Sequence, residues 1–437
     1  MEHRYLRRYP IGSDKRHWKQ DKFILSTFSP TCVYYNKNLQ NPDAYDVARR
    51  AVKTCADAGF NLLEMGWATP EVLRAAIPMC ESLGIDVIYQ NMEIYGGMQE
   101  RIGKEVKCDP EDIKNLVEEL SRYRHVIGFY VWDEPYLEPQ IKEARRQMDM
   151  FEECDPQKLL FTVAIPSYNK EFTWKNGEFS GYLQRYVETI DPVVLSLDYY
   201  PINKKHLPED QLDKTFMWYD LALMKKLAAE KNMPMWFYYQ GQNLHGVETF
   251  TFPMVRLMMN AGALYGAKGL QHYTAEGSVT KAGDGGRDIF FEDQKKIHAE
   301  FRELGNTLMA LDCKRVIHDD SMTAGNEYTV GLHETMADSE LLLGELPYRT
   351  SVSELEDEYG NKYLMVLNRD YETAKTVNLD LSDNFRVYEV SKTDGYQYVV
   401  EDNTNKLSVE LSAGDMALFR LQRASEEAFT IEYVLEK

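Results

Sequence analysis

Short apolar runs alternate with longer amphipathic stretches from about residue 22 to about residue 310. The short runs are rich in β-branched and aromatic side chains, whereas the longer ones repeat apolar residues at helical spacing. This alternation predicts βα units that build a parallel sheet, rather than a β-sandwich or a helical bundle. The predicted strands are Phe23–Phe28, Asn61–Gly66, Asp86–Asn91, Ile127–Trp132, Leu160–Ile165, Val193–Tyr199, Met235–Tyr239 and Gly269–Tyr273. The predicted helices between them include Tyr45–Ala58, Glu111–Tyr123, Pro139–Cys154 and Gln211–Asn232.

Eight such units over about 290 residues suit an α/β fold of the (β/α)8 TIM-barrel type, which usually takes about 250 residues. After a predicted helix at Ile297–Leu311 the pattern changes to short alternating strands separated by turn residues. That pattern predicts a smaller C-terminal all-β sandwich domain. The predicted organisation is an N-terminal arm (1–21), a catalytic (β/α)8 barrel (22–312) and an antiparallel β-sandwich (313–437). We expect the β domain to cover one side of the barrel, with a separate sugar-binding module as the alternative.

The end of the fourth predicted strand carries the most informative residues, Trp132-Asp133-Glu134-Pro135. Proline cannot continue the hydrogen-bonded ladder, so the strand stops where two adjacent carboxylates begin. In a TIM barrel the strand C-termini form the functional face. Repulsion between the carboxylates, beside a wall supplied by Trp132 and Tyr136, raises one pKa and leaves an acid able to protonate a leaving group. The alternative is an N-cap Asp followed by a first-turn Glu of the next helix.

The other predicted strand ends are also polar and aromatic. They carry Glu64, Trp67, Asn91, Asp198, Tyr199, Tyr200, Gln240, His272, Tyr273 and Glu276. Aromatic faces stack on sugar rings, while amides and acids bind hydroxyl groups, so such a cleft suits a carbohydrate. Glycoside hydrolysis then requires an acid for the departing oxygen and a second group that attacks or activates water.

The Trp132–Pro135 strand end and the segment Ala58-Gly-Phe-Asn-Leu-Leu-Glu64 resemble the (β/α)8 glycoside hydrolases of clan A, in particular the family 42 β-galactosidase-like barrels. The resemblance covers the barrel, about two thirds of the chain. Strand four of that clan ends in Asn-Glu-Pro with the Glu as acid/base, which implies this role for Glu134, while Asp133 replaces the Asn. The clan's nucleophile is a Glu at the end of strand seven. The matching residue is Gln240, whose amide cannot form a glycosyl ester.

Three arrangements remain open. Asp198 or Glu276 could activate water in an inverting reaction. A 2-acetamido group of the substrate could attack while Asp133 orients it beside Glu134, an arrangement that resembles the substrate-assisted N-acetylhexosaminidases, with support from Tyr199 or Tyr200. The barrel could also bind carbohydrate without catalysis.

The favoured prediction is a glycoside hydrolase that uses general acid catalysis by Glu134. The catalytic candidates are Glu134, Asp133, Asp198 and Glu276. The substrate-binding candidates are Glu64, Trp67, Asn91, Trp132, Tyr199, Tyr200, Gln240, His272 and Tyr273.

Composition restricts the partners. A formal charge of −20 and a pI near 5.0 argue against binding to nucleic acid or to an anionic membrane, and favour a neutral small carbohydrate substrate. No run approaches the roughly twenty apolar residues of a spanning helix, and the N-terminus lacks the apolar segment of a signal peptide. The first twenty residues are basic, and we expect them to lie on the acidic body, with nuclear targeting as the weaker alternative. The oligomeric state does not follow from the sequence.

Neither a metal nor a cofactor is expected. The nine histidines show no His-x-His or His-Glu-x-x-His spacing. The glycines at 283–286 lack the ending of a phosphate-binding loop, and no Gly-x-Ser-x-Gly motif occurs. The six cysteines are scattered singly, which indicates reduced thiols and a cytoplasmic protein. A secreted or periplasmic protein without its leader would look the same.

Overall fold

The structure is a computed structural model that describes residues 11–12, 17–33, 43–96, 108–169, 178–202, 212–244, 246–247, 249–323 and 333–423. Most of the predicted N-terminal arm lies outside these residues. All six cysteines are free thiols.

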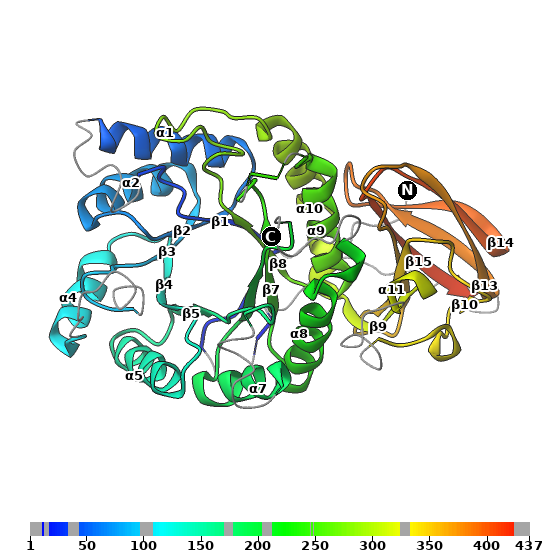
Figure 1. Ribbon diagram of the computed structural model, residues 1–437, viewed down its shortest axis with the longest axis horizontal. Helices are drawn as coiled ribbons and strands as arrows, with labels where there is room; N and C mark the ends of the chain where they lie inside the picture. The colour runs from blue at the N-terminus through cyan, green and yellow to red at the C-terminus, as the bar shows by residue number, and fades with distance from the viewer. Residues whose placement is uncertain are drawn as a thin grey trace, which may run out of the picture.

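Eight parallel strands form a closed barrel (Figure 1). Except for β5 and β6, each strand pairs with its neighbour in the chain, and β1 also pairs with β8. The barrel closes between β5 and β6, where the amide of Ala164 donates to the carbonyl of Ser196 at 2.9 Å. The predicted (β/α)8 barrel is therefore confirmed. Its strands are β1 (Ile24–Phe28), β2 (Leu62–Met65), β3 (Asp86–Tyr89), β4 (Val126–Asp133), β5 (Leu159–Val163), β6 (Leu195–Tyr199), β7 (Met235–Gln240) and β8 (Gly269–Tyr273).

Helices surround the barrel (Figure 1). They are α1 (Ala44–Asp57), α2 (Pro70–Leu83), α4 (Pro110–Leu120), α5 (Glu138–Cys154), α7 (Phe179–Ile190), α8 (Met217–Lys231), α9 (Phe252–Leu264) and α10 (Phe291–Ala310). The long helix predicted from residue 211 is instead a 3₁₀ turn, η1 (Leu212–Lys214), followed by α8. Within the described ranges, no helix combines the length and the apolar character needed to cross a membrane.

Local sequence sets the limits of α2. The Thr69 side chain accepts a hydrogen bond from the amide of Val72 at 3.4 Å, and Pro70 occupies the first turn, where its missing N–H costs nothing. The helix ends at Gly84, whose φ of 67° is the left-handed conformation that glycine adopts without strain. The chain then enters β3 two residues later.

Side chains alternate between the two faces of each barrel strand. Leu63 and Met65 of β2 pack outward in the core shared with the helices. Leu62 instead joins a core inside the barrel. The members of this inner core include Ile24, Phe28, Ile88, Tyr130, Leu159, Phe161, Val163, Trp236 and Tyr238. The barrel interior is thus packed, and inward residues near the strand C-termini are the ones that can form a site.

The C-terminal part is an all-β domain, as predicted. It contains β9 (Asp312–His318), β10 (Leu342–Leu343), β11 (Thr350–Glu356), β12 (Lys362–Asn368), β13 (Lys375–Val390), β14 (Gln397–Leu411) and β15 (Met416–Arg423), with short helices α11 (Asp320–Thr323) and η2 (Met336–Asp338). The strands form one antiparallel sheet in the order β10-β13-β15-β12-β11-β9, and β14 pairs with β13. Register shifts interrupt the β13–β14 pairing, and all seven strands contribute to one apolar core.

The β domain packs against the barrel beside α8, α9 and α10 (Figure 1). Tyr363 and Met365 of β12 belong to the same core as the outer face of the barrel. The side-chain amide of Asn260 on α9 donates to the carbonyl of Gly414 at 2.8 Å. The covering role expected for this domain matches these contacts.

A buried arginine joins the two parts. Arg369, which follows β12, is fully buried and donates to Asp213 Oδ1 of η1 at 2.8 Å. It also pairs with Asp319 and donates to the hydroxyl of Ser321 at 3.0 Å. Because Asp213 belongs to the barrel while Asp319 follows β9, one guanidinium neutralises carboxylates from both sides of the interface.

We expect Arg369→Met to lower the free energy of unfolding by about 3–5 kcal/mol, because it breaks the buried ion pair of Asp319 and leaves Asp213 with the more distant Arg349 at 3.4 Å. Thermal unfolding followed by calorimetry measures the loss. The matched control is Arg386→Met, which removes an exposed pair with Asp402 at 3.0 Å and should leave the free energy of unfolding almost unchanged. Equal losses in the two variants would contradict the structural role of Arg369.

Candidate active site

A β-bulge near the end of β4 aims the first carboxylate into the barrel. The pairing of β4 with β5 shifts register between Tyr130 and Trp132, so Val131 is an extra residue. Tyr130 and Asp133 consequently both face inward, and the Tyr130 hydroxyl donates to Asp133 Oδ1 at 3.0 Å. Val131 and Trp132 pack outward among the helices. The aromatic wall expected from Trp132 is therefore absent from the site, because the bulge turns this side chain away.

Glu134 has a φ of 48°, a left-handed conformation that costs a non-glycine residue about 1–3 kcal/mol. The surrounding chain is anchored. The hydroxyl of Tyr182 on α7 donates to the carbonyl of Pro135 at 3.0 Å and accepts from the amide of Ile165 at 3.2 Å. One tyrosine thus joins the segment after β4 to the segment after β5, and Glu134 is held at the barrel mouth.

The N-cap alternative for this motif is wrong. Helix α5 begins at Glu138, four residues after Glu134. Its first turn is capped by Gln140, whose Oε1 accepts from the amides of Tyr136 and Leu137, each at 3.1 Å. Neither Asp133 nor Glu134 caps the helix, so both carboxylates are available to the barrel mouth.

A pocket of about 150 Å³ lies at the C-terminal ends of the strands. Three of its side chains carry a carboxyl group: Asp133, Glu134 and Asp198. The other lining residues are Phe28, Trp67, Tyr130, Val163, Tyr200, Tyr238 and Tyr273. The structure therefore brings together six of the residues that the sequence singled out.

Stacked rings form one wall of the pocket. The rings of Tyr200 and Tyr273 lie 4.6 Å apart at 29°, and those of Phe28 and Tyr273 lie 5.8 Å apart at 21°. Trp67 meets Phe28 edge to face at 6.1 Å. These aromatic faces give the pocket a flat apolar surface of the kind that stacks on a sugar ring.

Asp198 of β6 and Glu134 form a hydrogen bond between their carboxyl groups. Burial raises the pKa of Asp198 well above its usual value, and the charges of Glu134 and Asp133 raise it further, while a hydrogen bond from Tyr200 opposes them. Asp198 is only 7% exposed. Two carboxylates in contact cannot both ionise easily, so the pair holds a proton to higher pH than an isolated carboxyl group does.

Glu64 lies inside the barrel and not among the pocket-lining residues. It is fully buried. Its Oε1 accepts from the hydroxyl of Ser26 at 2.5 Å and from the side-chain amide of Gln271 at 2.9 Å. Burial raises the pKa of Glu64 to about 7, an effect that these hydrogen bonds reduce and the charge of Asp133 increases.

Gln240 at the end of β7 is occupied by the backbone. Its Oε1 accepts from the amide of Ile202 at 2.8 Å, and its Nε2 donates to the carbonyls of Ile202 and Gln242 at 2.9 and 3.1 Å. This side chain holds together the segments that follow β6 and β7. It does not line the pocket where the clan's nucleophile was expected.

Strand alternation also explains why two other candidates lie elsewhere. Tyr199 and His272 each precede a pocket-lining residue and therefore face outward. Tyr199 packs edge to face on Tyr168 at 5.1 Å. His272 is fully buried between Phe60 and Tyr239, and burial lowers its pKa to about 3. Neither reaches the pocket.

Two further candidates serve their own loops. The side chain of Asn91 accepts from the amide of Glu93 at 3.0 Å and stabilises the turn after β3. Glu276 accepts from the amide of Gly283 at 3.3 Å in the connection after β8. Neither residue lines the pocket.

Phe28, Tyr130, Val163 and Tyr238 line the pocket but were not predicted. Each belongs to a strand and faces inward. Phe28 and Val163 end their strands, whereas Tyr130 and Tyr238 lie before the ends of theirs. Counting every second residue back from a strand end would have found Tyr238. Only the bulge in β4 brings Tyr130 to the same side as Asp133.

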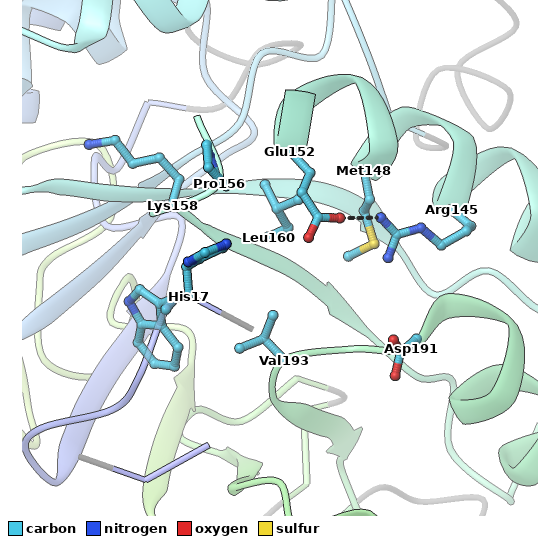
Figure 2. A pocket seen from close by; sticks show the side chains of 10 residues that line it. His17, Arg145, Met148, Glu152, Pro156, Lys158, Leu160, Asp191 and Val193 are labelled. Carbon is cyan, nitrogen blue, oxygen red and sulfur yellow. Dashed lines mark hydrogen bonds and ion pairs between the residues drawn. The ribbon is translucent and has the colours of Figure 1, made fainter. Parts of the chain in front are cut away.

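A second hollow lies at the opposite end of the barrel, beside the starts of β5 and β6 (Figure 2). Its volume is about 10 Å³, and Arg145 and Glu152 form an ion pair at 3.0 Å beside it. This hollow is too small for a ligand larger than water. Among the described residues there is also no group of three or more His, Cys, Asp or Glu side chains that could hold a metal ion.

We expect Glu64→Gln to change how stability depends on pH. Folded Glu64 keeps its proton up to about pH 7, whereas the unfolded chain loses it above about pH 4.5, so rising pH favours unfolding over this interval. The loss for the native protein is about 3 kcal/mol, and the variant avoids it. Unfolding free energies at pH 4 and pH 8 measure the difference. Glu292→Gln, an exposed site on α10, is the control, and a parallel pH dependence in the native protein and Glu64→Gln would contradict the prediction.

Neither a protein-family model nor a curated protein matches the sequence. Solved structures do match. A glycoside hydrolase is 11% identical with a TM-score of 0.58, over 96% of this chain and 97% of that chain. A family 5 glycoside hydrolase from Bacteroides vulgatus is 12% identical with a TM-score of 0.57, over 96% and 94%.

The β-galactosidase from the psychrophilic Marinomonas ef1 is 10% identical with a TM-score of 0.51, over 91% of this chain and 100% of that chain. At such identities the likeness establishes the fold, and the family 42-like detail is not confirmed. Over nearly its whole length, the chain shares the fold of the (β/α)8-barrel glycoside hydrolases.

Proposed function

We propose that this protein is a glycoside hydrolase in which Glu134 delivers a proton to the departing glycosidic oxygen. The observation that carries the proposal is the hydrogen-bonded pair of Glu134 and Asp198 in an aromatic-walled pocket at the barrel mouth. A proton held there to higher pH than by an isolated carboxyl group is what a general acid requires. The solved structures of similar fold, whose titles name glycoside hydrolases, support this reaction class.

The pair of Glu134 and Asp198 acts as one proton-holding unit. As the glycosidic C–O bond breaks, its electrons remain on the leaving oxygen, which takes the proton from Glu134. Asp198 then shares the negative charge that Glu134 acquires. We assign Asp198 this supporting role and not the activation of water, because a base must be ionised and its pKa is raised. Its contact with Glu134 is also far shorter than the roughly 6.5–9.5 Å between the carboxyl groups of an inverting pair.

Asp133 is the pocket carboxyl group outside this pair. The bulge in β4 aims it inward, and the hydroxyl of Tyr130 donates to it at 3.0 Å. We assign Asp133 the second carboxylate role, in which its charge stabilises the positive anomeric carbon. Water completes the reaction by supplying a hydroxyl group to that carbon and a proton to the pair.

We expect Glu134→Gln to lower kcat/KM on alkyl glycosides by about 10²–10⁴-fold, because an amide cannot donate the proton that an alkoxide needs in order to leave. A panel of methyl glucosides, galactosides and 2-acetamido analogues provides the assay. Glu138→Gln, an exposed glutamate at the start of α5, is the control and should leave activity unchanged. A loss of less than tenfold would remove Glu134 from the acid role. No turnover by the native protein on a broad panel would overturn the proposed activity.

The activity should fall as pH rises, because the pair must hold its proton to act as an acid. In Asp198→Asn only one carboxyl group remains, and the repulsion that helps to retain the proton is lost. We therefore expect the alkaline limb of the kcat/KM profile to move to lower pH in this variant. Profiles from pH 4 to pH 10 for both proteins test the shift. An unmoved limb would show that Asp198 does not share the proton.

A further inference from the structure

Two buried oxygen atoms at the pocket have no hydrogen-bond partner in the described structure: the hydroxyl of Tyr238 and Oδ1 of Asp198. Tyr238 belongs to β7 and Asp198 to β6, and the register of these adjacent strands pairs the two residues directly. Both line the pocket, and their exposed fractions are 2% and 7%. The two atoms are thus unsatisfied on neighbouring strands that face the same cavity.

Such atoms need an explanation, since native proteins satisfy most buried polar groups. Leaving one without a partner destabilises the folded protein. Not every tyrosine hydroxyl on β7 lacks a hydrogen-bond partner. The hydroxyl of the next residue, Tyr239, accepts from Gln294 Nε2 at 3.1 Å on the outer face. The unsatisfied hydroxyl belongs to the tyrosine that faces the pocket.

Tyr238 offers an O–H donor, and Asp198 Oδ1 offers a lone-pair acceptor. A sugar hydroxyl group donates one hydrogen bond and accepts others at the same time. A single such group between the two side chains therefore satisfies both, donating to Asp198 and accepting from Tyr238.

We propose that Tyr238 and Asp198 form a subsite that recognises one hydroxyl group of the bound sugar, with Tyr238 as a specificity-determining residue. This inference rests on the function proposed for the same pocket. Both side chains line the pocket, so a sugar bound there meets them while Asp198 keeps its contact with Glu134.

The consequence is strong discrimination against a sugar that lacks this hydroxyl group. Sites built to hydrogen-bond a substrate hydroxyl reject the analogue without it by about 10⁴–10⁵-fold, whereas apolar pockets discriminate far less. Without the Tyr238 hydroxyl, the sugar hydroxyl group loses one of its two hydrogen bonds. The kcat/KM of the parent sugar then falls towards that of the analogue that lacks this hydroxyl group.

The test uses the 4-nitrophenyl glycoside that the native protein hydrolyses best, together with its 2-, 3-, 4- and 6-deoxy analogues. We expect one analogue to lose at least about 10³-fold in kcat/KM on the native protein. Tyr238→Phe should lower kcat/KM for the parent by at least about 10²-fold but for that analogue by less than about threefold. Because each analogue is assayed on both proteins, differences in its intrinsic reactivity cancel. Tyr239→Phe, the same change on the outer face, should keep the full discrimination.

Equal losses on the parent and every analogue in Tyr238→Phe would show that the tyrosine acts only structurally. A native protein indifferent to all four deoxy changes would show that water, not sugar, satisfies the two atoms. Either result overturns the subsite.

If the native protein hydrolyses no glycoside, the proposed function fails, and calorimetric titration with glucose, galactose, N-acetylglucosamine and their deoxy forms tests the subsite separately. Weaker binding of one deoxy form to the native protein, but not to Tyr238→Phe, would support the subsite. No binding of any of these sugars would overturn it.

Discussion

The contact between the carboxyl groups of Glu134 and Asp198 is the constraint on which the site depends. Two acids at hydrogen-bond distance in a buried pocket cannot both carry a charge without a large cost, so one proton stays between them. Asp133 adds a third carboxyl group to the same pocket and strengthens this effect. The chemistry of the barrel mouth therefore depends on how close the ends of β4 and β6 bring the side chains of Glu134 and Asp198.

The scaffold supplies that closeness through few local features. A bulge in β4 changes the side-chain alternation once, which directs Asp133 inward and Trp132 outward. The hydroxyl of Tyr182 then fixes the chain immediately after Glu134 by bonding segments that follow two different strands. Because β6 needs no bulge, Asp198 faces inward by ordinary alternation.

The same fold recurs in solved glycoside hydrolases that are only 10–12% identical to this chain. A parallel barrel requires apolar residues on the outward positions and a filled interior, and many sequences satisfy these demands. The residues at the strand ends are free to differ. In this chain the end of β7 carries Gln240, whose amide bonds to the backbone of neighbouring segments, and a tyrosine two residues earlier reaches the pocket instead.

Apolar periodicity by itself determined the barrel, the limits of its strands to within about two residues and the all-β domain, because burial of these patterns leaves few alternative folds. It also placed Glu134 at a strand end, since proline stops the ladder. Only the tertiary structure decided which strand-end residues meet. Tyr199 and His272 were expected in the site but face outward, and Glu64 lies beneath it. These outcomes depend on side-chain direction, on one bulge and on contacts between residues more than sixty positions apart, none of which local sequence encodes.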